Sequence, residues 1–208
     1  MGHVAIAIPV ERHVSIHWAI NLAKIIGTSP GTRIVYRSGT VIDVLRNALV
    51  KDVMGMPDTS HILFLDSDVI PHPAVIPTLL SHHYPITSGA YRSKTGVPGV
   101  WMKLPDGSPN RYMAIPADQV QNKVIMADAV GAGCLMVDMR LFKRVPEPWF
   151  EWTIREIDNP QGGMSEDFAF CKKVQEYTGL KVLVNGFLSS AHEGLSRINL
   201  RGDLEDWL

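Results

Sequence analysis

Apolar and polar positions along the first half of the chain follow a pattern that predicts strands and helices in turn. Short continuous apolar runs predict buried strands, and apolar residues spaced three or four apart predict helices with one core-facing side. The expected strands cover residues 4–8, 32–36, 62–65 and 85–90, and the expected helices cover residues 14–26, 41–53 and 73–80. In the first helix, the stripe expected to face the core is Ile16, Ala19, Ile20, Ala23 and Ile26. This order predicts a doubly wound, Rossmann-related nucleotide-binding half over residues 1–91.

The second half, residues 92–208, changes character. Residues 92–123 are rich in Gly, Pro and polar side chains, with strand-like pieces at residues 100–104 and 112–115 and a hairpin-turn candidate at Asp106-Gly107. Beyond them we expect a strand over residues 129–138, whose glycines permit close backbone approach, helices over 139–145 and 168–178, and a last strand over 182–184. The chain is therefore expected to form a single α/β domain, residues 1–208, in which helices flank a mixed sheet and a β-rich excursion adds a second wall.

Composition and charge narrow the class of protein. The 208 residues are 46% hydrophobic, enough for one well-buried core, and 20 Lys and Arg against 21 Asp and Glu give a net charge of −1. No global field would draw such a chain onto nucleic acid or an anionic membrane. Cys134 and Cys171 lack a Cys-x-x-Cys spacing, so neither a disulfide framework nor a zinc site is expected, and reduced cytoplasmic thiols are the simpler interpretation. The first residues lack the basic segment of a signal peptide, and Pro9 interrupts their apolar run early.

Two carboxylates end the apolar run at residues 62–65. Asp66 and Asp68 follow this run with only Ser67 between them. Ligands of doubly wound sheets bind at the carboxyl ends of the strands, and two like charges this close repel unless a cation joins them. Hard divalent ions such as Mg²⁺ and Mn²⁺ take carboxylate oxygens together with substrate phosphates. The segment therefore predicts a metal site for phosphate chemistry.

Several motifs occur in an order that resembles a known family. These are the βαβαβ half, the Asp66-Ser67-Asp68 strand end, the Gly131-Ala132-Gly133 strand, Ser165-Glu166-Asp167 and a late His192. Together they resemble the glycosyltransferases of the GT-A fold, most closely the family-2-like transferases, over nearly the whole chain. The resemblance implies a metal-dependent enzyme that moves a sugar from a nucleoside-diphosphate sugar, with UDP- and GDP-sugars the expected donors, to a hydroxyl acceptor. It also makes the β-rich excursion the acceptor side of the molecule.

The same resemblance assigns roles to individual residues. Asp66 and Asp68, together with His192, would hold Mn²⁺ or Mg²⁺. Asp167 would be the catalytic base, because an inverting displacement needs the acceptor hydroxyl deprotonated as it attacks C1 of the sugar. A retaining mechanism would not require that base, and inversion is the expectation. The expected nucleotide-sugar contacts are Pro9, Val10, Glu11, Arg37, Arg46, Asp66, Ser67 and Gly133.

Each of these assignments has a structural alternative. The acidic strand end could be an ordinary polar loop, and the Ser-Glu-Asp segment could favour a helix start through N-capping and the helix dipole. His192 is equally compatible with a loop, and Arg46 with a solvated helix face. The aromatic residues Trp149, Phe150 and Trp152 suit sugar rings but also suit a core.

Other classes of function also remain open on the sequence alone. A nucleotidyltransferase could share the first half and the acidic site, although the sequence has neither a P-loop nor a glycine-rich Lys-Arg signature near its start. A noncatalytic nucleotide-sugar-binding relative would keep the pocket without turnover. The tail over residues 197–208 mixes charges with apolar side chains and is compatible with covering the site, with a subunit contact or with a peripheral membrane contact.

Overall fold

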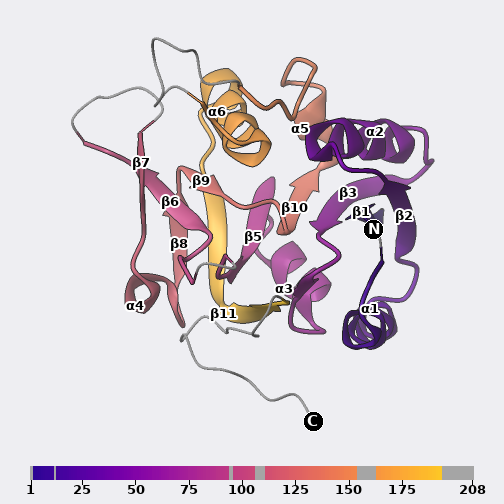
Figure 1. Ribbon diagram of the computed structural model, residues 1–208. Coiled ribbons are helices and arrows are strands. Elements are labelled where there is room, and N and C mark those ends of the chain that lie inside the picture. The colour runs from indigo at the N-terminus through magenta and orange to yellow at the C-terminus, as the bar shows by residue number, and fades with distance from the viewer. Residues whose placement is uncertain (1, 12, 94–95, 106–110, 154–162, 194–208) are drawn as a thin grey trace.

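A mixed β-sheet runs through the middle of the molecule (Figure 1). The computed structural model describes residues 2–11, 13–93, 96–105, 111–153 and 163–193. The eight strands of the large sheet are β1 (His3–Val10), β2 (Arg33–Ser38), β3 (Thr59–Leu65), β4 (Val69–Ile70), β5 (Ile86–Tyr91), β8 (Val124–Ala127), β10 (Cys134–Asp138) and β11 (Val182–His192). Their order is β2-β1-β3-β10-β5-β11-β4, with β8 paired to β11. Strand β1 is parallel to β2 and β3, whereas β10 is antiparallel to β3 and β5, so the sheet is mixed.

Helices cover both faces of this sheet (Figure 1). On one face lie α2 (Ile42–Met54), α5 (Met139–Phe142) and α6 (Glu166–Thr178), and on the other lie α1 (Ile16–Thr28) and α3 (Val75–Ser81). Successive residues of β3 alternate between two cores: Ile62 and Phe64 join the α2 side, and Leu63 and Leu65 join the α1 side. A strand covered on both faces has no reason to alternate apolar with polar residues, which accounts for its continuous apolar run.

A second sheet of three strands forms the β-rich part of the chain. Its order is β7 (Tyr112–Ala114), β6 (Val100–Lys103) and β9 (Ala129–Val130), and the short α4 (Ala117–Val120) follows β7. The single strand expected over residues 129–138 is thus divided between the two sheets. The turn between its parts needs glycine, because a Cβ on Gly131 would lie 2.2 Å from the Tyr91 hydroxyl oxygen. The expected close backbone approach is confirmed.

The buried face of α1 differs from the expected one. Ile16 is 69% exposed and Ile20 is 50% exposed, whereas Trp18 and Ile25 are buried. The Trp18 indole buries a larger apolar area than either isoleucine, and its Nε1–H reaches the backbone carbonyl oxygen of Asp66 at 2.9 Å. The spacing of apolar residues within the helix predicted the wrong buried face, because Asp66, whose carbonyl accepts from the Trp18 indole, is 48 residues away in the sequence.

Several other elements differ from those expected. Strand β11 extends to His192 instead of ending at residue 184, because its second part pairs with β4. Strands β4 and β8 and helix α4 were not among the expected elements. Helix α6 begins two residues earlier than expected, and α5 ends three residues earlier. Asp106-Gly107 and residues 197–208 lie outside the described residues. Within the described ranges, none of the helices has the length and apolar character needed to cross a membrane.

Candidate functional site

The acidic turn after β3 is held by its own backbone. The Asp66 N–H donates to the carbonyl oxygen of Gly133 at 3.1 Å, and the Asp66 carbonyl accepts from the Val69 N–H at 3.1 Å. The same carbonyl accepts the Trp18 indole N–H. With β4 starting at Val69, the chain turns sharply over Ser67 and Asp68. The segment is therefore an ordered turn at the carboxyl end of β3, as the sequence predicted.

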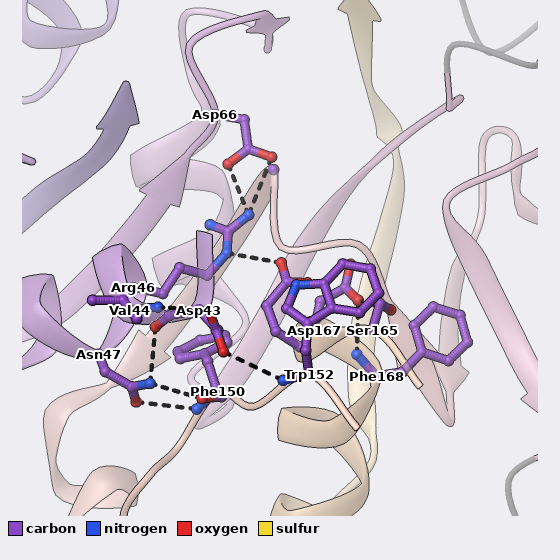
Figure 2. A network of polar contacts seen from close by, with 12 residues as sticks. Asp43, Val44, Arg46, Asn47, Asp66, Phe150, Trp152, Ser165, Asp167 and Phe168 are labelled. Carbon is purple, nitrogen blue, oxygen red and sulfur yellow. Dashed lines mark hydrogen bonds and ion pairs between the residues drawn. The ribbon is translucent and has the colours of Figure 1, made fainter. Parts of the chain in front are cut away.

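Arg46 lies beneath this turn and joins two carboxylates (Figure 2). Its Nη2 donates to Asp66 Oδ1 at 2.9 Å and Oδ2 at 3.2 Å, and its Nε donates to Glu166 Oε1 at 3.3 Å. Burial by itself would lower the pKa of Arg46, but the carboxylates of Asp66 and Glu166 raise the pKa above its ordinary value. Only 2% of Arg46 is exposed. The alternative of a solvated helix face is therefore wrong.

Asp68 and His192 meet where β4 pairs with β11. The pairing sets His192 opposite Val69, and His192 Nε2 lies 3.3 Å from Asp68 Oδ2. The other ring nitrogen, Nδ1, lies 2.9 Å from the carbonyl oxygen of Arg92. A carbonyl oxygen only accepts hydrogen bonds, so Nδ1 carries a proton. In the neutral imidazole, Nε2 then bears a lone pair, and this lone pair faces the carboxylate of Asp68. A histidine oriented in this way beside a carboxylate fits a divalent cation.

The expected set of three metal ligands is only partly brought together. Asp68 and His192 are adjacent, whereas both carboxylate oxygens of Asp66 accept hydrogen bonds from Arg46. Among the residues that the structure describes, no three His, Cys, Asp or Glu side chains are grouped as potential ligands of one metal ion. Two protein ligands are compatible with a cation that takes its remaining ligands from phosphates and water.

Asp167 lies in the first turn of α6. Its Oδ1 accepts from the Ser165 hydroxyl and, at 2.8 Å, from the Phe168 N–H. Burial raises the pKa of Asp167, although the Ser165 hydrogen bond opposes the shift. Ser165 makes no side-chain capping bond to the helix, so its hydroxyl serves Asp167 and not the backbone. Since Arg46 binds the neighbouring Glu166, Asp167 is the better candidate for a base of this pair.

A small pocket lies between the first strands and α2, next to the acidic turn. Its volume is about 180 Å³, and its walls are Pro9, Glu11, Gly39, Thr40, Ile42, Leu45, Asp66, Ser67 and Asp68. The sequence predicted five of these positions. It missed the Gly39-Thr40 turn and the two apolar residues of α2. The turn could have been predicted, because it directly follows the second parallel strand and so lies at the edge of the sheet where ligands bind.

Four predicted contacts do not line this pocket: Arg46, described above, and three others. Val10 packs against the core on the α1 side. Arg37 pairs with Asp52, its Nε lying 2.7 Å from Oδ2 and its Nη2 lying 2.6 Å from Oδ1. Gly133 supports the acidic turn through its backbone and does not line the pocket. Their roles in donor binding stay predictions.

Two further features lie outside this pocket. A larger cavity of about 370 Å³ lies near the start of β3 and the end of β10, and none of the acidic residues at positions 66, 68 and 167 lines it. Of the aromatic residues before α6, Trp149 and Phe150 are buried, as a core role requires, whereas Trp152 is 53% exposed. The backbone of Thr153, the next residue, pairs with Met164 just before α6.

Comparisons with known proteins bear on the fold. No protein-family model and no curated protein sequence matches the chain. Among solved structures, A197 from STIV aligns over 98% of this chain and 94% of its own, with 16% sequence identity and a TM-score of 0.70. GalNAc-T7, solved with UDP, GalNAc and Mn²⁺, aligns over 92% of this chain at 9% identity and a TM-score of 0.50, and this chain spans 44% of it.

Together with the mixed sheet flanked by helices, these likenesses define a GT-A-like glycosyltransferase fold. The fold class expected from the sequence is confirmed.

Proposed function

We propose that the protein is a metal-dependent glycosyltransferase that moves a sugar from a nucleoside-diphosphate sugar to a hydroxyl acceptor with inversion. The observation that carries the proposal is the pairing of His192 Nε2 with Asp68 Oδ2 at 3.3 Å beside the pocket at the carboxyl ends of β1 and β3. GalNAc-T7, which shares the fold, was solved with UDP, a sugar and Mn²⁺. The family-2-like character of the chain belongs to the same proposal.

The donor binds along the acidic turn. The pocket lined by Pro9 and Glu11 takes the nucleoside, for which UDP- and GDP-sugars are the first candidates. Asp68 and His192 would hold Mn²⁺ or Mg²⁺, which would stabilise the negative charge of the departing diphosphate without any proton transfer. Asp66 borders the same pocket and is oriented by Arg46.

Asp167 serves the acceptor. A carboxylate oxygen of Asp167 takes the proton of the acceptor hydroxyl while the hydroxyl oxygen bonds to C1 of the donor sugar and the bond from C1 to the nucleoside diphosphate breaks. Partial burial favours this step, because a carboxylate with a raised pKa is a stronger base than an ordinary aspartate. The Ser165 hydroxyl and the Phe168 N–H orient the carboxylate through Oδ1 and leave Oδ2 for the acceptor.

A donor screen tests the proposal. The protein is incubated with UDP-, GDP-, CDP- and dTDP-sugars, with Mn²⁺ or with a chelator, and released nucleoside diphosphate is measured. We expect metal-dependent release from one class of donor. A folded protein that turns over none of them would overturn the enzymatic proposal; nucleotide binding without turnover would favour a noncatalytic relative, and pyrophosphate release from nucleoside triphosphates would favour a nucleotidyltransferase.

The pH dependence of transfer should report on Asp167. The base acts in its ionised form and its pKa is raised by burial, so kcat/KM should rise with pH through a value above the ordinary aspartate pKa of about 3.9. Removing the Ser165 hydroxyl, whose hydrogen bond favours the ionised form, should move this rise to still higher pH in Ser165→Ala. Rate profiles between about pH 4 and about pH 9 test both expectations. Superimposable profiles of the two proteins would argue against Asp167 as the base.

Trp152 should bind the acceptor. Its indole is half exposed next to the segment that pairs with Met164 at the start of α6, and aromatic faces suit sugar rings. Trp152→Ala should raise KM for a saccharide acceptor by about tenfold, equivalent to about 1.4 kcal/mol, with little change in KM for the donor. Trp152→Phe should retain most of the affinity. Tyr177→Ala, which removes a similarly exposed aromatic side chain near the far end of α6, is the matched control, and an unchanged acceptor KM in Trp152→Ala would contradict the assignment.

A further inference from the structure

Arg46 connects three segments that are distant in the sequence. The side chain leaves α2, contacts the carboxylate of Asp66 at the end of β3 and contacts the carboxylate of Glu166 at the start of α6. Figure 2 shows its guanidinium between the acidic turn and the first turn of α6. The guanidinium carbon lies 5.7 Å from the Phe64 ring centroid and 5.9 Å from the Phe150 ring centroid.

This environment makes the arginine a fixed element of the site. Its side chain is 3% exposed, and the Glu166 side chain is 7% exposed. A buried carboxylate that loses its cationic partner is strongly destabilised, because water does not replace the missing charge. The planar fork of an arginine can hold two carboxylates at once, whereas an ammonium group cannot reproduce this geometry. Arg46 does not line the pocket beside the acidic turn, and its role in donor binding stays a prediction.

The arginine also determines what Asp66 can do. Both carboxylate oxygens of Asp66 accept from the same Arg46 nitrogen, Nη2. Asp68, two residues later, instead faces His192. Neighbouring carboxylates of one turn thus have different partners, one an arginine and the other a histidine suited to a cation.

We propose that Arg46 is a positioning residue that holds Asp66 away from the cation. Its hydrogen bonds also fix the position of Asp66 relative to Glu166, the residue before the proposed catalytic base. The inference rests on the proposed function for the presence of a cation, but the bridge itself does not depend on it. A single buried side chain then aligns the donor side of the site, at the end of β3, with the acceptor side, at the start of α6.

Mn²⁺ binding to the intact protein tests the first part. In Arg46→Met, Asp66 is released beside Asp68 and one positive charge is lost, so the Mn²⁺ affinity should rise, by roughly tenfold, since affinity follows the number and charge of the ligands. The double variant Arg46→Met/Asp66→Asn should lose this gain. Electron paramagnetic resonance of free Mn²⁺ measures both values without any substrate.

The matched control is Arg140→Met. Arg140 also pairs with an aspartate, Asp138, but its side chain is 87% exposed and lies at the larger cavity, outside the site. The Mn²⁺ affinity of the Arg140→Met variant should equal that of the wild type. An Arg46→Met protein that unfolds cooperatively yet binds Mn²⁺ no more tightly than wild type would overturn this part of the inference.

Urea unfolding tests the bridge independently of any metal or sugar. Arg46→Met and Glu166→Gln should each lower the unfolding midpoint, and the double variant should lose less than the sum, because it no longer leaves a buried carboxylate without its partner. Additive losses would overturn the bridge. If Arg46→Met fails to fold, Arg46→Lys takes its place in both experiments, with smaller changes of the same sign expected. A wild-type protein without Mn²⁺ affinity would count against the proposed function and the cation part, while the unfolding cycle would still decide on the bridge.

Discussion

Asp167→Asn should lower the rate of sugar transfer by about 10²–10⁴-fold, the range that a general base contributes. The substitution preserves the size of the side chain and an oxygen that can accept from Ser165 and Phe168. It removes the only group proposed to take the acceptor proton. Donor binding should therefore change little, and the loss should appear in kcat. The measurement is the steady-state rate of transfer with saturating donor and acceptor.

The control for this prediction is on the same helix. Glu176 is a half-exposed carboxylate of α6 whose Oε1 lies 3.7 Å from Lys172 Nζ, and Glu176→Gln should transfer sugar at the wild-type rate. Retention of full activity in Asp167→Asn would exclude this residue as the base and would favour a retaining mechanism, which does not need one.

Asp68→Ala should abolish metal-dependent turnover almost completely. The variant removes a carboxylate ligand, and with it the charge stabilisation of the leaving diphosphate, so kcat/KM should fall by at least about 10²-fold. Mn²⁺ affinity should fall in parallel, because His192 alone would remain of the pair. Calorimetric titration with Mn²⁺ and the donor assay measure the two losses separately.

A carboxylate outside the site provides the comparison. Asp118 is exposed on α4, and Asp118→Ala should keep both the Mn²⁺ affinity and the rate of the wild type. If Asp68→Ala retained Mn²⁺ binding, the cation would belong to other residues, and the proposed donor site would be wrong. Chelation of the metal from the wild-type protein should reproduce the loss seen in Asp68→Ala.

Much of the fold near the site could be predicted from short stretches of sequence. The apolar run of β3 is a local signal, because a strand buried on both faces leaves no position for polar residues. The acids that follow it occupy the carboxyl edge, where such sheets bind ligands. Glycines at positions 131 and 133 likewise predicted a close approach of the backbone. The structure explains it, because the Tyr91 hydroxyl lies where a Cβ on either glycine would be crowded.

The partners of the charged residues could not be predicted in the same way. Arg46 is 20 residues from Asp66 and 120 residues from Glu166, and no local pattern specifies which distant carboxylates a guanidinium will meet. The face of α1 was mistaken for the same reason, since the Trp18 indole bonds to a carbonyl 48 residues away. Strand β4, with two residues, is too short to give a periodic signal.

By itself, the sequence determined the class of fold, the acidic turn after β3 and the identity of the carboxylates and the histidine that could carry the chemistry. These depend on hydrophobic periodicity and on residue types, which are local properties of the chain. Only the tertiary structure decided that His192 faces Asp68 while Asp66 faces Arg46. Such pairings arise from strand register and from the need to neutralise charges in a buried site, and both depend on segments that meet only when the chain has folded.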